Sequence, residues 1–148
     1  MDHAQKAAEL FMQGYNCAQA VAVAFCDVTG LTEDAAARMA SAFGGGMGRQ
    51  REVCGAVSGM LMVTGILYGY HTPGDDQSKK ELYTLVQQLC GQFREQTGSI
   101  VCREILKNPP SDPNPTPRTA EFYKKRPCVR CVSLAAAVLE QYIKEQGV

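Results

Sequence analysis

Apolar residues recur at helical spacing along most of the chain, and this periodicity predicts an all-α protein. In the first stretch Ala4, Ala7, Ala8 and Phe11 fall on one face of a helix, and Gly14 supplies its stop. No stretch of the sequence shows a convincing strand pattern. We therefore expect helices alone.

Two further helices are predicted from residues that cap helix N-termini. Asn16, with Gln19 three residues later, is expected to cap a helix that opens with Cys17 and runs until Gly30. Thr32 is expected to cap the next helix, whose first turn is acidic and which three consecutive glycines end. Both helices therefore have a start signal and a stop signal.

A long uncharged stretch, from Val53 to Tyr70, predicts a central helix with Cys54 in its first turn. Its eighteen residues reach the minimum length of a membrane-spanning helix. However, four glycines together with Ser58 and Thr64 dilute its hydrophobicity, and no other stretch could form a membrane bundle with it. We therefore expect a buried helix, covered on nearly all sides, whose glycines let neighbouring helices approach closely.

The second half of the chain predicts two more helices before a break. Ser78 begins a capping-box pattern and is expected to open a long amphipathic helix that Gly98 closes. Ser99 is expected to cap the next helix, with Cys102 in its first turn. The proline-rich segment at about 108–118 cannot continue any helix and is expected to form an extended surface connection.

A last helix is predicted from Pro127, which suits the first helical position. Cys128 and Cys131 begin an apolar face that continues through Ala135. Together these elements predict one domain, residues 1–148, built as a bundle of about six to seven helices around the glycine-rich, nearly uncharged central helix.

Composition removes several classes of function. Lysine plus arginine equals aspartate plus glutamate at 15 each, so no net field draws the chain to nucleic acid or to an anionic membrane. The N-terminal residues lack the basic and apolar regions of a secretory signal, and we expect a cytoplasmic protein. Of the two histidines, His3 is expected at a loose terminus and His71 at the surface. Seven cysteines, an odd number, argue against a closed set of secreted disulfides and favour metal or redox chemistry.

Four cysteines are placed in the first turns of predicted helices: Cys17, Cys54, Cys102 and Cys128. At such positions unpaired backbone N–H groups and the positive end of the helix dipole lower the pKa of a thiol. We therefore expect all four thiols to ionise readily and to share one small chamber. The basic run Lys124–Arg126 adds positive charge ahead of Cys128 and could dock an acidic redox partner, or be a solvated surface. Cys26 and Cys90 lie deeper in their helices and are expected to be packed as small apolar residues.

Glycines gather on both sides of Cys54 and leave the backbone bare there. They permit turns with positive φ, uncover amide groups, and let another helix or a bound group come close to the sulfur. A small anion could bind the exposed amides together with Arg49, the alternative being a solvated arginine. A flexible loop before a tight helix crossing would explain the glycines but not the cysteine. The candidate binding residues are Gly45, Gly46, Gly48, Arg49, Gly55 and the helix cap Asn16.

These motifs resemble a known family of small redox-active proteins, named after its C_GCAxxG_C_C pattern. The landmarks are "GYNCAQAV" at 14–21, "FGGGMGR" at 43–49, "CGAVSGMLMVTGILYG" at 54–69, "GSIVCREIL" at 98–106 and "CVRCVSLAAAVLE" at 128–140. The resemblance covers nearly the full chain and implies an all-helical fold. It also implies four signature cysteines, which fall on Cys17, Cys54, Cys102 and Cys128, whereas Cys131 stands where an apolar residue is more usual. A similar module in split-Soret cytochromes adds an iron–sulfur cluster to the cofactors to consider.

Three functions remain open at the level of sequence. The first is redox chemistry by a thiol-based oxidoreductase that works with a redox partner, with Cys131 as an extra partner of Cys128 in a C-x-x-C pair. The second is metal binding, with the four signature cysteines around zinc or a [2Fe–2S] cluster. The third is a helical binding or scaffold protein whose cysteines are merely packed.

Overall fold

Regular structure in the computed structural model, which describes residues 2–147, consists of helices. In chain order they are α1 (His3–Met12), α2 (Cys17–Ala24), α3 (Cys26–Thr29), α4 (Glu33–Ala40), the 3₁₀ turn η1 (Ser41–Phe43), α5 (Gly44–Met47), α6 (Gly55–Tyr68), α7 (Asp76–Thr97), α8 (Cys102–Leu106), α9 (Ala120–Lys125) and α10 (Cys128–Glu145). Six of these helices have seven residues or more. Residues 2–147 contain no strand, only an isolated antiparallel bridge between Val53 and Val101. The predicted all-α class is confirmed.

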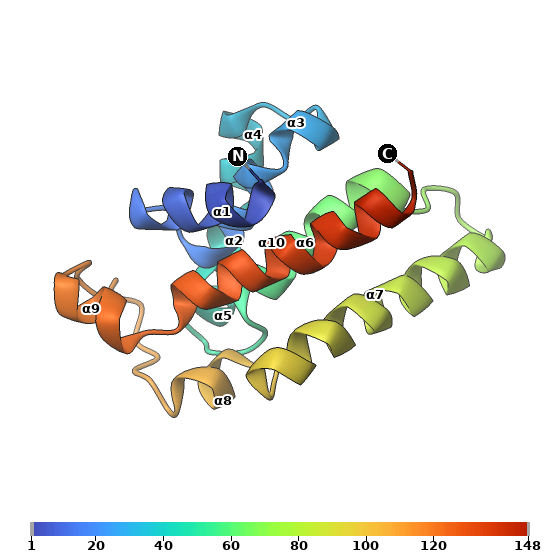
Figure 1. The fold of residues 1–148 in the computed structure, drawn as a ribbon. Coiled ribbons are helices and arrows are strands. Elements are labelled where there is room, and N and C mark those ends of the chain that lie inside the picture. The colour runs from blue at the N-terminus through green and yellow to red at the C-terminus, as the bar shows by residue number, and fades with distance from the viewer. Residues whose placement is uncertain (1, 148) are drawn as a thin grey trace.

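The helices pack around α6 and α10. The last helix, α10, crosses the middle of the bundle and packs against α1, α2, α6 and α7 (Figure 1). On the N-terminal side α2 contacts α6, α1 and α4, while α7 contacts both α6 and α10. The short helices α8 and α9 lie near the end of the bundle where α10 begins (Figure 1). The starts of several helices are therefore gathered at one end of the molecule.

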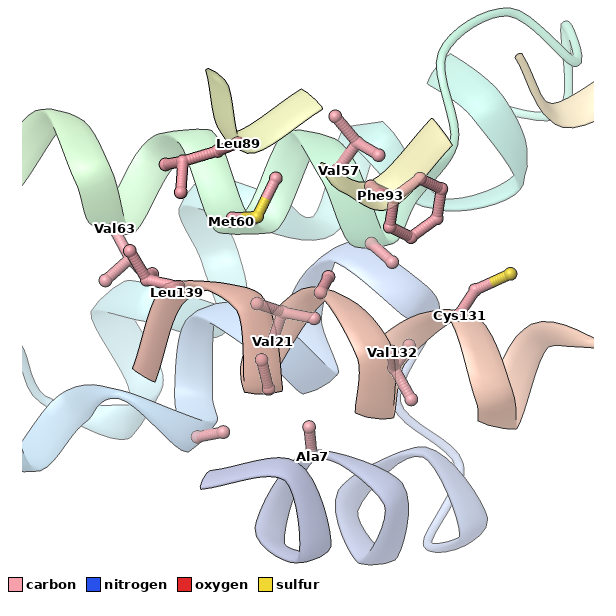
Figure 2. Packing of buried hydrophobic residues seen from close by; sticks show 14 of the residues in the cluster. Ala7, Val21, Val57, Met60, Val63, Leu89, Phe93, Cys131, Val132 and Leu139 are labelled. Carbon is pink, nitrogen blue, oxygen red and sulfur yellow. The ribbon is translucent and has the colours of Figure 1, made fainter. Parts of the chain in front are cut away.

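The central helix α6 is buried, as its uncharged sequence predicts. Val57, Met60 and Val63 are each exposed by 2% or less. Figure 2 shows them packed among side chains of the neighbouring helices, which include Val21, Leu89, Phe93, Val132 and Leu139. Full burial of one such aliphatic or aromatic side chain stabilises the folded state by about 1.5–3 kcal/mol. No helix in residues 2–147 combines the length and the apolar character needed to cross a bilayer.

The backbones of α2 and α6 touch at two glycines. A Cβ atom added at Gly59 would lie 2.6 Å from the carbonyl oxygen of Ala18 and 3.1 Å from Cβ of Val21. A Cβ atom added at Gly55 would lie 3.1 Å from Cβ of Cys17 and 3.1 Å from the amide nitrogen of Ala18. The expectation that the glycines of the central helix allow a close approach is therefore confirmed at these two positions.

Several predicted helix starts are wrong, and local hydrogen bonds explain why. Cys54 is the N-cap of α6 rather than part of its first turn, because its N–H group donates to the carbonyl of Ile100 at 2.7 Å and its backbone is extended (ψ 131°). Asp75, not Ser78, caps α7, since its carboxylate accepts the N–H of Ser78 at 3.1 Å. Ser99 does not cap α8, which begins three residues later at Cys102.

The helix predicted from Cys17 to Gly30 is interrupted. Phe25, at φ −101° and ψ 14°, leaves the helical region and separates α2 from α3. Near the other end of the chain, α9 is a helix that the periodicity does not predict, capped by the hydroxyl of Thr119. Pro127 lies just before α10 as its N-cap rather than inside it.

The N-terminal end of α1 is anchored, so the predicted loose position of His3 is wrong. His3 Nδ1 lies 2.6 Å from Oε1 of Glu140, and Nε2 lies 3.0 Å from the carboxylate of Asp27. The imidazole also stacks on the ring of Phe25, with 4.2 Å between the ring centroids. Contacts from the junction of α2 and α3 and from α10 hold this side chain. His71 is exposed, as predicted.

The contact between α2 and α6 generates a testable prediction about stability. We expect Gly59→Ala to lower the free energy of unfolding by about 1–3 kcal/mol, because the new methyl group would overlap the backbone of α2. Gly65→Ala, in the same helix, is the matched control, because a Cβ atom there meets no atom within 4 Å. It should be neutral or stabilise the protein by up to about 1 kcal/mol. Urea unfolding followed by circular dichroism measures both values, and equal effects would contradict the described crossing.

Candidate functional site

A cavity of about 320 Å³ lies where α2, α6, α8 and α10 begin. Five of the seven cysteines line it, namely Cys17, Cys54, Cys102, Cys128 and Cys131. The structure thus brings the four signature cysteines into one chamber, as expected, and Cys131 lines the same chamber. Cys26 and Cys90 are not among its lining residues. Cys90 is buried in the helical core, which agrees with the expectation for a packed apolar residue.

Cys17 is positioned by the cap of α2. The Asn16 side chain accepts the N–H of Gln19 at 2.9 Å, and the Gln19 side chain accepts the N–H of Asn16 at 3.1 Å. This reciprocal capping box is the one that the sequence predicts. Asn16 also donates from Nδ2 to the carbonyl of Ser41 at 3.0 Å, which ties the cap to the segment before the glycine loop. Cys17 follows as the first residue of the helix.

Cys54 and Cys102 are positioned by a short pairing of extended backbone. The N–H of Cys54 donates to the carbonyl of Ile100, and the N–H of Cys102 donates at 2.6 Å to the carbonyl of Glu52. These bonds flank the bridge between Val53 and Val101. Residues about fifty positions apart are thereby held side by side, each at the start of a helix.

Neighbouring thiols in the cavity influence one another. The strongest influence on the pKa of Cys17 comes from Cys128, and the strongest influence on that of Cys54 comes from Cys131. Cys17 and Cys128 are partly buried, whereas Cys54 and Cys131 are 7% and 3% exposed. The sequence suggests Cys131 as a partner of Cys128, and in the structure Cys131 also acts on Cys54. All seven cysteines are free thiols.

Cys128 is a cavity thiol with a lowered pKa. The hydrogen bond from Cys17 is the main cause that lowers the pKa of Cys128 to about 7, and burial opposes it. Positive charge on Arg126, Arg118 and Arg51 acts in the same direction as the hydrogen bond. The proton of this pair stays on Cys17, whose pKa the same bond and burial raise well above its ordinary value.

The expectation that all four thiols ionise readily is wrong for three of them. The hydrogen bond to Cys131 and burial raise the pKa of Cys54, although N–H groups at the start of α6 lower it in part. Burial raises the pKa of Cys102 more than the neighbouring Arg51 lowers it. Loss of hydration disfavours a thiolate, and here it outweighs the helix N-termini.

Four arginines provide the charge of the cavity wall, namely Arg49, Arg51, Arg118 and Arg126. No aspartate or glutamate is among the described residues that line it. Arg51 is 4% exposed and donates from Nε to the carbonyl of Pro110 at 2.9 Å, while its Nη1 lies 3.7 Å from Sγ of Cys102. The cavity therefore combines several thiols with a positive wall.

Arg49 anchors the proline-rich connection rather than pointing freely to solvent. It donates from Nε to the carbonyl of Asp112 and from Nη1 to the hydroxyl of Thr116, both at 2.7 Å. An ion pair of 3.7 Å to the Asp112 carboxylate completes the contact. Pro113, Pro115 and Thr116 line the cavity as a result. The predicted surface connection is thus also one wall of the chamber.

The glycine loop forms another wall of the cavity. Gly45, Gly46 and Gly48 have φ values between 66° and 69°, the left-handed region that favours glycine. Gly46 lies directly against Cys102, because an added Cβ atom would lie 2.8 Å from Cβ of Cys102. All the candidate binding residues from the sequence line the cavity: Asn16, Gly45, Gly46, Gly48, Arg49 and Gly55.

Sequence reasoning does not single out Arg118, which the structure places in the cavity wall. Its guanidinium group donates to the carbonyls of Phe11 and Tyr15 and lies 4.3 Å from the centroid of the Phe11 ring. Phe122, from α9, packs beside it. The capping residue Thr119 is the signal that could have predicted α9. No local signal could have predicted contacts more than a hundred residues apart.

The cavity thiols lie near one another but do not form a metal-ligand set. Within residues 2–147 no set of three or more His, Cys, Asp or Glu side chains is arranged to hold a metal ion. In this arrangement the four signature cysteines do not fit the tetrahedral ligand set that zinc or a [2Fe–2S] cluster requires.

The fold and the cavity together define an all-helical protein with a cluster of cysteines at the starts of its helices. A model of the family described as "Putative redox-active protein (C_GCAxxG_C_C)" matches residues 15–142, well over half of the chain, and the chain belongs to this family. Comparison with curated proteins and with solved structures gave no match. The family resemblance drawn from the sequence is thereby confirmed.

The hydrogen bond between Cys17 and Cys128 generates a prediction about reactivity. The rate at which iodoacetamide modifies Cys128 should rise with pH around a midpoint near the pKa of about 7. Cys17→Ala should move this midpoint upward, because it removes the donor that stabilises the thiolate. Cys26→Ala, outside the cavity, is the control and should leave the midpoint unchanged. Peptide mass spectrometry at a series of pH values measures the rate. A midpoint near that of an ordinary thiol in both proteins would contradict the described pair.

Proposed function

We propose that the cavity carries out thiol–disulfide redox chemistry, with Cys128 as the attacking thiolate and Cys17 as the resolving thiol. One observation carries the proposal: a thiol with a lowered pKa is hydrogen-bonded to a second thiol inside a cavity with a positive wall. Nucleophilic attack requires a thiolate, and a thiol with a pKa near ambient pH is the most effective attacking group. The name of the family agrees with this class of chemistry.

The reaction balances as an exchange with a substrate disulfide. The Cys128 thiolate attacks one sulfur of the substrate, and the other sulfur leaves as a thiolate. The departing thiolate takes the proton held by Cys17. The Cys17 thiolate then attacks the mixed disulfide at the Cys128 sulfur, and the second half of the substrate leaves as a thiolate. The protein pair loses two electrons to form one disulfide, and the substrate gains them.

The second pair, Cys54 with Cys131, lies deeper in the protein and is the candidate for a further two electrons. Both residues are less exposed than the first pair, and the hydrogen bond to Cys131 together with burial raises the pKa of Cys54. A buried thiol of raised pKa reacts slowly with an external disulfide. We infer that this pair acts after the first pair rather than in place of it.

Two alternatives receive less support. Metal binding by Cys17, Cys54, Cys102 and Cys128 would need these ligands around one centre, and no set of three or more such ligands is arranged to hold a metal among residues 2–147. A purely structural role suits Cys26 and Cys90, but it leaves unexplained why five cysteines line one cavity with four arginines. Stoichiometric bound metal would favour the first alternative, and thiols that resist oxidation would favour the second.

Controlled oxidation should produce one specific disulfide. With one equivalent of diamide we expect a Cys17–Cys128 crosslink, reversible by dithiothreitol and identified by peptide mass spectrometry. Cys128→Ser should abolish crosslinking at this pair, while Cys17→Ser should leave Cys128 trapped as a mixed disulfide with an added small disulfide. Cys90→Ser is the matched control, because Cys90 is buried in the core, away from the cavity. Random crosslinks, or no change in free thiols, would contradict the proposal.

A further inference from the structure

Arg51 carries a buried hydrogen-bond donor that has no partner. Its side chain lines the cavity, and the residue is only 4% exposed. Nε and Nη1 are engaged by Pro110 and Cys102, but Nη2 is buried without a hydrogen-bond partner among the described residues. A buried donor on a charged group costs free energy when it is left unpaired, and native proteins rarely leave one so.

The backbone around Arg51 is held in a conformation that side chains seldom adopt. Met47, Arg49 and Arg51 all have positive φ, at 70°, 69° and 62°. Such residues cost free energy individually and persist only where the surrounding structure enforces them. Hydrogen bonds from Arg51 N–H to the carbonyl of Gly45 and from Glu52 N–H to the carbonyl of Gly46 provide that restraint. The loop therefore restrains the backbone of Arg51, whose side chain lines the cavity and contacts Pro110 and Cys102.

Two further arginines complete the positive wall beside Cys128. The guanidinium of Arg118 is held by backbone carbonyls and by the ring of Phe11. That of Arg126 lies 5.1 Å from the centroid of the Phe122 ring and makes no ion pair with a carboxylate in residues 2–147. Aromatic rings attract such cations but do not cancel their charge. An anion entering the cavity would meet uncompensated positive charge.

We infer that the cavity binds a small molecule through an oxyanion group, with Nη2 of Arg51 as the buried donor, and that the substrate carries this group close to its reacting sulfur. The planar guanidinium suits both carboxylate and phosphate oxygens. The volume of about 320 Å³ lies at the lower end of the range for small-molecule sites and suits a compact ligand better than a peptide segment. The statement about the substrate rests on the proposed thiol chemistry, whereas anion binding does not.

The inferred anion site uses Arg51, whereas the sequence suggested an anion site at Arg49. The loop glycines do line the cavity, but Arg49 is occupied by Asp112 and Thr116. Arg51, two residues later, has the unpaired donor instead. An interaction of Arg51 with Cys102 alone does not account for this arrangement, because that contact uses Nη1 and leaves Nη2 without a partner.

A pair of alkylating reagents tests the inference on the unaltered protein. Iodoacetate carries a carboxylate, while iodoacetamide has nearly the same size and no charge. We expect the ratio of the iodoacetate rate to the iodoacetamide rate to be about tenfold higher at Cys128 than at Cys26, because positive charge concentrates the anion in the cavity. Cys26 serves as the internal reference, since it lies outside the cavity. Equal ratios at the two cysteines would overturn the inference.

Competition at constant ionic strength then identifies the oxyanion. Protection of Cys128 from iodoacetamide by succinate but not by phosphate would assign a carboxylate ligand, and the reverse result a phosphate. Protection by neither would overturn the inference. Arg51→Gln should abolish protection, while Arg38→Gln should retain it, because the Arg38 side chain is 81% exposed and pairs with Asp34 on α4. Loss of protection in both variants equally would also count against Arg51 as the donor.

The competition result in the unaltered protein stands even if Arg51→Gln does not fold. Failure of anion binding can also be separated from failure of the redox proposal. Protection without a Cys17–Cys128 disulfide would leave the anion site and remove the redox role. A Cys17–Cys128 disulfide without protection would support the redox role and remove the anion site.

Discussion

The backbones of α2 and α6 meet at Gly55 and Gly59 with no side chain between them. This contact places the first residue of α2, Cys17, beside the start of α6, where Cys54 is the cap. The paired backbone around Val53 and Val101 then adds Cys102, and α10 packs on both α2 and α6 and brings Cys128 and Cys131. A wider spacing between α2 and α6 would separate the cysteines, so the chamber depends on the two glycines.

Inside this chamber, burial and charge act against each other. Hydrogen bonds to a second thiol and burial raise the pKa of Cys17 and Cys54, and burial raises that of Cys102. Hydrogen bonding from Cys17 and positive charge from the arginines reverse the balance at Cys128. The result is an asymmetric pair, with the nucleophile on one residue and the proton on the other. Such asymmetry is what stepwise disulfide exchange requires.

Short-range patterns predict much of this molecule, and long-range contacts account for the rest. Helical spacing, the capping box at Asn16 and the bare backbone near Cys54 depend on neighbours in sequence, and each is found in the structure. The raised pKa of Cys54 depends on Cys131, and the placement of Arg118 depends on Phe11. No local pattern encodes either contact, because the partners come from helices that only the folded chain brings together.

The most direct test of the account is a count of thiols and metal in protein purified without oxygen. We expect no stoichiometric iron or zinc and seven free thiols in the reduced protein. Mild oxidation should remove two of these thiols reversibly. Stoichiometric metal that the cavity cysteines hold would contradict the paired arrangement of the sulfurs. Seven thiols that resist oxidation would contradict the redox role.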